Sequence, residues 1–343
     1  MVSPNEKIGI AIQGAGTVSS GHLRAYLRNP YVQIVAIGSR TKEGARQKAL
    51  EVGIDPASIK LYDAVEDVVG DPDVDALSIT TPHERHALDA IAAAKAGKHC
   101  LIEKPIAMNK ADVLAIDKAV TKAGIKTACG FVLRYIPMVQ AQKAMLDQGL
   151  LGDMLYVQTD YWHNPEQSGY PGAEGHVFRA DSSAMLSGGC HAVDLARYLM
   201  GSDIVSVSAV STSGYDDLPY PLMQSAVVTF ASGKIGKVSA CTEQWMPYQF
   251  NVDLLGTDGG IRDNRFYSRK LPGFTDWGTF PTVTPNSGLV SHHPFDGEID
   301  HFIDCIRNDV ESHANVRDSV NTHLAVFAID ESTQHGGVVR VGW

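Results

Sequence analysis

Short apolar runs alternate with amphipathic segments through the first part of the chain. Apolar runs typical of buried strands occur at 7–13, 33–38, 60–62, 74–80, 100–102 and 126–131. Between them, helices are predicted at 22–28, 43–52, 64–69, 86–96 and 112–123. This regular alternation of strands and helices predicts a doubly wound parallel sheet.

The pattern changes after this part of the chain. A helix predicted at 137–148 precedes a strand at 154–162, and alternating stretches at 204–211, 226–230, 234–242 and 250–255 predict an antiparallel meander. Helices at 298–306 and 316–334 and a strand at 338–341 close the chain. Since 343 residues exceed one ordinary core, we expect two domains, 1–132 and 133–343.

A glycine-rich turn follows the first strand. It reads Gly14-Ala15-Gly16-Thr17-Val18-Ser19, which matches G-x-G-x-x-G with serine in the third glycine position. The first glycine permits the tight turn, and the second lets the backbone approach a pyrophosphate. A small third residue allows the next helix to pack closely. We therefore predict that Gly14, Gly16, Thr17 and Val18 bind a dinucleotide.

The end of the second strand bears on the choice of dinucleotide. An Asp or Glu commonly accepts hydrogen bonds from the ribose hydroxyls of NAD here, but this chain has Ser39-Arg40-Thr41-Lys42. Ser39 and Arg40 can hold a 2′-phosphate, which favours NADP. Alternatively, Ser39 or Thr41 caps the next helix and Arg40 stacks on adenine, an arrangement compatible with NAD.

The stretch from His99 to Pro105 reads H-C-L-I-E-K-P and ends a buried strand in charged residues. Ligands of open α/β sheets bind outside the carboxyl ends of the strands, so Lys104 is expected to face the cofactor. The alternative is that Glu103 and Lys104 are solvated charges that close a strand. We assign to the same edge, as further cofactor-binding residues, Thr80, Thr81, Pro82, His83 and Glu103.

These motifs resemble one known family. The patterns I-x-T-P-x-x-x-H and A-x-A-G-K-H-x-L-I-E-K-P between Ile79 and Pro105, with His22 after the glycine turn, are similar to the glucose–fructose oxidoreductase / inositol dehydrogenase / MocA (Gfo/Idh/MocA) family. The resemblance implies an N-terminal Rossmann domain and a C-terminal domain with a large, mostly antiparallel open sheet. It also implies NAD(P)-dependent chemistry on sugars or cyclitols, and pairing of the open sheets into a homodimer or homotetramer.

A helix that begins near Ser183 carries candidate chemistry. Ser187, His191, Asp194 and Tyr198 are spaced to share one face of this helix. The family motif G-x-H-x-x-D coincides with Gly189, His191 and Asp194. The family often has an aspartate in place of Ser187, so its acid–base network is not carried over unchanged.

The segment between Trp162 and Ala184 is rich in Gly, Pro and His and is long for an idle connection. Aromatic and hydrogen-bonding groups suit a sugar ring, although a plain surface loop is the alternative. In and around this segment we noted His176, Phe178 and Arg179. The residues assigned to substrate binding are Arg134, Tyr135, Tyr161, Trp162, His163 and Asp194.

Composition narrows the classes of function. The chain has 29 Lys and Arg against 39 Asp and Glu, a net charge of −10 that disfavours nucleic-acid binding. Its five cysteines are isolated, no metal-binding spacing occurs, and the adjacent His292 and His293 are interpreted as coincidence. With no long apolar segment and a polar leader, we expect a cytoplasmic protein that does not bind membranes.

Together these features predict an NAD(P)-dependent dehydrogenase or reductase of a sugar, glycoside or cyclitol. His191 is the expected general base, and Lys104 is expected to hydrogen-bond the reacting oxygen, although the family leaves open which of them takes the proton. Asp194 would bind substrate hydroxyls or orient the histidine. The alternatives are an NAD-dependent glycosidase that acts by transient oxidation, and a non-catalytic dinucleotide or sugar sensor.

Overall fold

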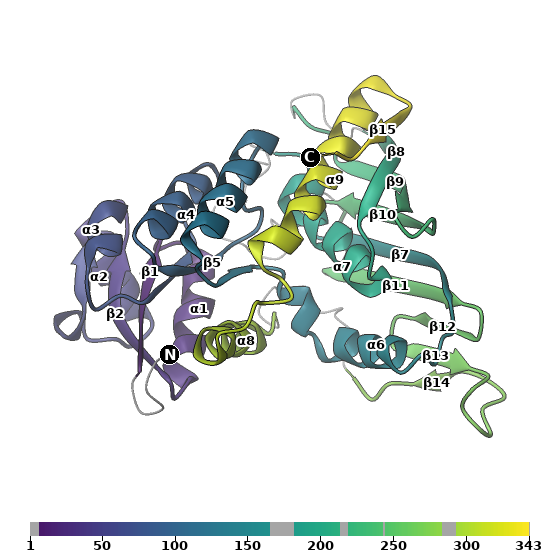
Figure 1. Ribbon diagram of the computed structural model, residues 1–343, viewed down its shortest axis with the longest axis horizontal. Coiled ribbons are helices and arrows are strands. Elements are labelled where there is room, and N and C mark those ends of the chain that lie inside the picture. Colours follow the sequence, from purple (N-terminus) through teal and green to yellow (C-terminus); the bar gives the residue numbers. More distant parts are fainter. Residues whose placement is uncertain (1–6, 165–181, 213–218, 243, 283–292, 343) are drawn as a thin grey trace. The chain divides into compact units, whose positions relative to one another are not determined.

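The structure is a computed structural model that describes residues 7–164, 182–212, 219–242, 244–282 and 293–342 (Figure 1). The chain divides into two compact units. Unit 1 comprises Met1–Val132 and Pro294–Val320, and unit 2 comprises Leu133–His293 and Asn321–Trp343. Within the described residues, no helix is both long enough and apolar enough to cross a membrane. Four residues named in the sequence analysis lie outside the described residues: His176, Phe178, Arg179 and His292.

Unit 1 contains a six-stranded sheet in the order β3-β2-β1-β4-β5-β6, in which every pairing is parallel. This confirms the doubly wound sheet predicted from the sequence. The order reverses between β1 and β4, which makes their carboxyl ends the topological switch point. The strands are β1 (Ile8–Gln13), β2 (Val32–Gly38), β3 (Lys60–Tyr62), β4 (Ala76–Ile79), β5 (His99–Ile102) and β6 (Thr127–Cys129).

Helices cover this sheet, and local signals set where they begin and end. Thr41 caps the second helix by accepting a hydrogen bond from the Gly44 N–H, and Asn109 caps the fifth through the Asp112 N–H. Gly124 ends the fifth helix in the left-handed region. The helices are α1 (Thr17–Arg28), α2 (Lys42–Glu51), α3 (Val65–Gly70), α4 (His86–Lys95) and α5 (Lys110–Ala123).

A segment that we expected in the second domain belongs to unit 1. Helix α8 (Phe295–Asn308) places Ile299, Phe302 and Ile303 in one buried cluster with Ile8 of β1 and Leu23 of α1. Its stripe of apolar residues was visible in the sequence, but the stripe does not say which apolar surface it will cover. The predicted range 133–343 therefore includes a stretch, Pro294–Val320, that packs with unit 1.

Unit 2 is built on a nine-stranded sheet in the order β14-β13-β12-β11-β7-β10-β9-β8-β15. The sheet is mostly antiparallel as predicted, but it is not a simple meander, because β7 lies between β10 and β11 and runs parallel to β10. The strands are β7 (Met154–Trp162), β8 (Ile204–Thr212), β9 (Met223–Phe230), β10 (Ile235–Cys241), β11 (Gln249–Gly256), β12 (Gly259–Arg262), β13 (Arg265–Ser268), β14 (Gly278–Thr279) and β15 (Val338–Arg340).

Helices α6 (Pro137–Asp147), α7 (Cys190–Met200) and α9 (Val316–His335) complete the chain, and Figure 1 shows α7 and the later part of α9 on one side of the unit 2 sheet. A π-helical turn, Met185–Gly189, leads directly into α7. Two glycines of this turn allow it to approach the sheet closely. A Cβ atom on Gly188 would lie 2.6 Å from the Tyr161 ring, and one on Gly189 would lie 2.5 Å from Ala240 Cβ.

Candidate functional site

Two backbone segments meet closely at the switch point of unit 1. Gly14 has a φ of 111°, and a Cβ atom there would lie 2.5 Å from the Thr80 carbonyl carbon and 2.6 Å from the Thr81 nitrogen. The Thr80 hydroxyl donates to the Gly14 carbonyl at 2.9 Å. Only glycine satisfies both the dihedral angle and the close approach. The structure therefore brings the predicted residues Gly14, Thr80 and Thr81 together.

The amino end of α1 lies directly after this turn. Gly16 is exposed and is the N-cap residue, and Thr17 and Val18 begin the helix without a side-chain cap. Ser19 is fully buried, and its hydroxyl donates to the Gly16 carbonyl at 2.6 Å. Uncapped backbone N–H groups at a helix start bind anions, so this end of α1 can hold a pyrophosphate.

The end of β2 lies beside the same turn, since the Gly14 N–H donates to the Gly38 carbonyl at 2.8 Å. Thr41 caps α2, which was one of the two arrangements considered from the sequence. Ser39 is half-buried and Arg40 is exposed. Among the described residues, no hydrogen bond or ion pair engages the Arg40 guanidinium. That guanidinium is therefore available to a ligand.

His86 connects the segments that follow β4 and β5. Its Nδ1 lies 2.8 Å from the Pro105 carbonyl oxygen, and its Nε2 lies 2.7 Å from the Thr81 carbonyl oxygen. The side chain is 1% exposed. His86 thus fixes Lys104-Pro105, a cis peptide, relative to the turn at Thr81. Sequence analysis noted this residue only as part of a family pattern and did not assign it to the site.

His83, which follows the exposed Pro82, lies near the end of β5 and is half-buried. Burial, the Lys104 ammonium and the nearby His86 together lower the pKa of His83 to about 3. The imidazole is therefore neutral at physiological pH and can donate one hydrogen bond and accept another. Lys104 itself is half-buried at the carboxyl end of β5.

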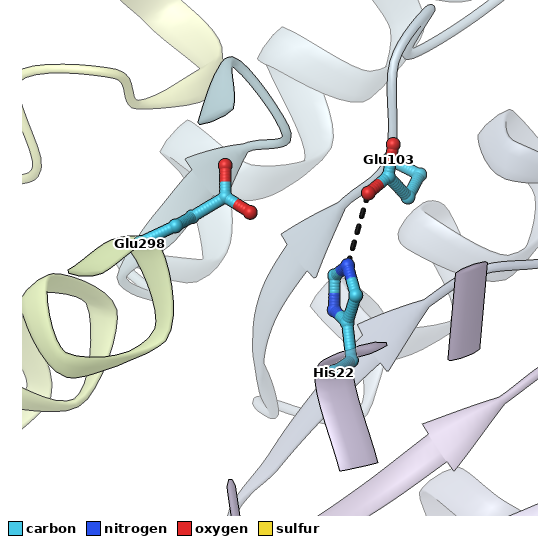
Figure 2. Close-up of side chains that lie close together, drawn as sticks. All are labelled: His22, Glu103 and Glu298. Atoms are coloured by element: carbon cyan, nitrogen blue, oxygen red, sulfur yellow. Dashed lines mark hydrogen bonds and ion pairs between the residues drawn. The ribbon is translucent and has the colours of Figure 1, made fainter. Parts of the chain in front are cut away.

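Glu103 is buried beside Lys104, and Figure 2 shows its carboxyl group directed toward His22. Its Oε1 lies 2.9 Å from His22 Nε2, and its Oε2 accepts the Lys104 backbone N–H at 3.1 Å. Burial raises the pKa of Glu103, but the hydrogen bond to His22 and the charge of Lys104 outweigh burial and leave the pKa below its usual value. The solvated position considered from the sequence is therefore wrong for Glu103.

In unit 2, two predicted substrate residues bind each other. Arg134 Nε donates to Asp194 Oδ2 at 2.7 Å, and a second guanidinium nitrogen binds the other carboxylate oxygen. The guanidinium also lies 4.8 Å from the centre of the Tyr198 ring. Asp194 is therefore anchored by Arg134, a pairing that sequence analysis did not foresee.

Tyrosine and histidine side chains form a second group in unit 2. The Tyr161 ring stacks on His191 with centroids 5.5 Å apart, and its edge meets Tyr248 at 5.5 Å. The Tyr248 hydroxyl lies 3.1 Å from His293 Nε2, and the His163 ring lies 5.1 Å from the Tyr248 ring. Burial raises the pKa of Tyr248, so its phenol keeps its proton. We call this set the Tyr–His cluster.

The structure does not bring every predicted substrate residue to the Tyr–His cluster. Successive side chains of a strand point to opposite faces, and Trp162 therefore faces away from Tyr161. The pairing agrees: Tyr161 lies beside the buried Ala240 and Phe250, whereas Trp162 lies beside the half-buried Cys241 and Gln249. Tyr135 is buried in a 3-10 turn, Val132–Tyr135, before α6.

Sequence reasoning assigned no role in the site to Tyr248 or His293. Tyr248 stands alone before a strand, and His293 looked like one of two adjacent histidines in a loop. Neither position has a motif around it. The contacts that join them to His191 and Tyr161 come from segments far apart in the sequence, so local patterns carry no signal for them.

Comparisons with known proteins agree with this arrangement. Residues 8–131 match the model of the oxidoreductase family with an NAD-binding Rossmann fold, Gfo/Idh/MocA, and residues 139–262 match the C-terminal domain model of the same family.

Among curated proteins, the chain is 27% identical to scyllo-inositol 2-dehydrogenase (NAD(+)) of Bacillus subtilis, covering 88% of this chain and 87% of that protein. It is 28% identical to 1,5-anhydro-D-fructose reductase of Ensifer adhaerens, covering 76% and 77% of the two chains. The solved structure of levoglucosan dehydrogenase in complex with NADH and levoglucosan has a TM-score of 0.84 at 23% identity, covering 98% of this chain and 100% of that one. The chain belongs to the Gfo/Idh/MocA oxidoreductase family.

Proposed function

We propose that this protein is an NAD(P)-dependent dehydrogenase or reductase that transfers a hydride between nicotinamide and a secondary alcohol or ketone of a cyclitol or sugar. The observation that carries the proposal is Lys104, at the carboxyl end of β5 in the sheet whose switch point is formed by Gly14 and Thr80. The relatives named above, an inositol dehydrogenase and an anhydrofructose reductase, support the substrate class.

The residues of unit 1 fit a dinucleotide. Gly14, Gly16 and the start of α1 at Thr17 and Val18 would hold the pyrophosphate through backbone N–H groups. The turn at Thr80, Thr81, Pro82 and His83 and the segment Glu103-Lys104 would line the nicotinamide end, because these lie at the carboxyl ends of β4 and β5. The cofactor supplies the hydride acceptor or donor.

We propose NADP as the preferred cofactor, with NAD as the alternative. The end of β2 lacks a carboxylate for the ribose hydroxyls, whereas Ser39 and the exposed Arg40 guanidinium can bind a 2′-phosphate. The name of the Bacillus relative specifies NAD(+) for that protein.

The side chains of the protein would orient the alcohol and move its proton. His191 is the proposed general base, with its ring stacked on Tyr161 in the Tyr–His cluster. Lys104 would hydrogen-bond the same substrate oxygen and stabilise the negative charge that develops on it. Asp194, anchored by Arg134, would orient the imidazole or accept a hydrogen bond from a substrate hydroxyl.

A substrate panel tests the proposal. Cyclitols, free sugars and glycosides are incubated with each oxidised cofactor, and the absorbance of the reduced nicotinamide is recorded. We expect turnover with at least one cyclitol or sugar, and a decrease in kcat of about 10²–10⁴-fold for His191→Gln. The exposed His335→Gln on α9 is the matched control and should retain wild-type kcat. Hydrolysis of aryl glycosides without net cofactor reduction would instead indicate the glycosidase alternative.

The homo-oligomer paired through the unit 2 sheet and the cytoplasmic location stay predictions. Light scattering of the purified protein measures the first, and fractionation of the source cells measures the second.

A further inference from the structure

A chain of buried polar contacts leads to the backbone of Lys104. The Tyr26 hydroxyl lies 2.7 Å from Ser78 Oγ, which lies 3.2 Å from His22 Nδ1. The other ring nitrogen of His22 lies 2.9 Å from Glu103 Oε1, and Glu103 Oε2 accepts the Lys104 N–H. Each of these side chains is buried, so their geometry is fixed by packing in unit 1.

Glu298 of α8 lies next to this chain of contacts. Its side chain is fully buried, and neither carboxyl oxygen has a hydrogen-bond partner among the described residues. Figure 2 shows its carboxyl group pointing toward His22 and Glu103. One atom of each of the three side chains lies within 4.8 Å of the other two. A carboxyl group in this position has no known use in the proposed chemistry.

The charges around Glu298 decide its protonation. A buried carboxylate without a hydrogen bond is costly, and a second negative charge near Glu103 adds to that cost. Burial first, and the Glu103 carboxylate second, raise the pKa of Glu298 well above its usual value. A neutral carboxylic acid avoids both costs and offers an O–H donor. The separation from Glu103 is short enough to be closed by a side-chain rotation or spanned by one water molecule.

We propose that His22, Glu103 and Glu298 form one proton-sharing group, in which Glu298 is a neutral acid that donates a hydrogen bond to Glu103 and thereby positions Lys104. Glu298 and His22 are positioning residues, because they act on the reaction through Glu103. The effect on turnover rests on the proposed function, whereas the protonation of Glu298 does not.

A divalent cation among the same three side chains is the competing interpretation. The group offers one nitrogen and two carboxylates, a set that zinc could use only with water as a fourth ligand and that calcium or magnesium would complete with further oxygen ligands. The 2.9 Å contact between His22 and Glu103 is already a hydrogen bond. A single proton on Glu298 therefore accounts for the arrangement without additional ligands.

Infrared spectroscopy tests where the proton lies, without reference to activity. The difference spectrum of wild type minus Glu298→Gln at neutral pH should contain the carbonyl band of a protonated carboxylic acid. Glu103→Gln should move the loss of that band to lower pH, because the Glu103 carboxylate no longer raises the pKa of Glu298. A carboxylate signal, or a stoichiometric metal in elemental analysis of the purified protein, would overturn the proposal.

Stability measured against pH gives a second test. The folded-state pKa of Glu298 is raised above its unfolded value, so its contribution to stability is present below the unfolded pKa and is lost as pH rises toward the folded pKa. Glu298→Gln should reduce this loss of folding stability with rising pH. An unchanged pH dependence of stability would overturn the proposal. Among the described residues, the titratable or charged groups that act on Glu298 or its partner Glu103 are Tyr26, His22, Lys104, His86 and His83.

Kinetics test the positioning role. Glu298→Gln keeps a hydrogen-bond donor and should retain kcat within about twofold, whereas Glu298→Leu cannot donate and should lower kcat about 10–100-fold. The dissociation constant of the dinucleotide should stay unchanged in both variants. Equal kcat in folded Leu and Gln variants would overturn the positioning role while leaving the infrared result intact. If the Leu variant does not fold, His22→Asn replaces it. Its kcat and its dissociation constant for the dinucleotide are then compared with those of wild type.

Discussion

Arg134 and Asp194 hold each other in the interior of unit 2, with Arg134 Nε 2.7 Å from Asp194 Oδ2 and each side chain 2% exposed. A buried charge pair of this kind gives little net stability, but removal of one partner leaves the other charge buried and unpaired. The stability of unit 2 near His191 should therefore depend strongly on keeping both members of the pair.

Arg134→Met is expected to lower the free energy of unfolding by about 3–5 kcal/mol, because Asp194 loses its guanidinium partner in the interior. The double variant Arg134→Met/Asp194→Leu should be less destabilised than Arg134→Met alone, since no charge stays buried. Urea denaturation measures both. A single variant within about 1 kcal/mol of wild type would contradict the importance of the pair.

Ser39→Asp is expected to reverse cofactor preference. The new carboxylate would accept hydrogen bonds from the ribose hydroxyls of NAD and repel a 2′-phosphate. The ratio of kcat/KM for NADP to that for NAD should fall at least about 100-fold, which corresponds to about 2.7 kcal/mol. Arg40→Ala should lower kcat/KM for NADP with little effect on NAD. A wild-type enzyme that strongly prefers NAD would refute the phosphate interpretation.

His83 should make stability fall in acid. Burial and Lys104 lower its folded-state pKa to about 3, so between that value and its usual one the unfolded chain binds more protons. Stability therefore rises with pH across this window and is lost as pH falls. With allowance for partial exposure, the loss between pH 7 and pH 4 is about 1–3 kcal/mol. His83→Gln should remove this component from urea midpoints measured across the window, and an identical acid dependence would disprove it.

Phe302→Ala in α8 should destabilise unit 1, although Phe302 lies far along the chain from the rest of that unit. Its fully buried ring belongs to the cluster around Ile8 and Leu23, and the cavity left should cost about 3–5 kcal/mol. Loss of dinucleotide binding on heating, followed by fluorescence, reports on unit 1. An exposed control on the same helix is Asp304→Ala, which should be neutral. Equal melting of the two variants would contradict the assignment of α8 to unit 1.

The parts of the fold set by local patterns could be predicted from the sequence. The strands from β1 to β7 and their helices follow runs of apolar residues and the glycines that end them, and the Gly14 turn follows from steric limits on its backbone. The insertion of β7 between β10 and β11 could not be predicted, because strand order depends on pairings between distant segments.

The residues of the candidate site also separate into those set by local patterns and those set by contacts between distant segments. Gly14, Thr80 and Lys104 were predicted because each follows the carboxyl end of a strand of a parallel sheet. The π-helical turn before His191, the Arg134–Asp194 pair and the place of Tyr248 were not predicted. These features depend on contacts between elements that are far apart in the sequence, and residue spacing does not encode such contacts. Glu298 begins a predicted helix to which no site residue was assigned, and nothing in the sequence indicated that it is fully buried.

The central claim is that Lys104 takes part in hydride transfer on a cyclitol or sugar. It is tested most directly by nicotinamide reduction with the best substrate of the panel, compared among wild type, Lys104→Ala and the exposed control Lys95→Ala. The account predicts turnover by wild type and the control, and a loss of at least about 10²–10³-fold in kcat for Lys104→Ala with the dinucleotide still bound. Undiminished turnover by Lys104→Ala, or no turnover by wild type with any cyclitol or sugar, would contradict it.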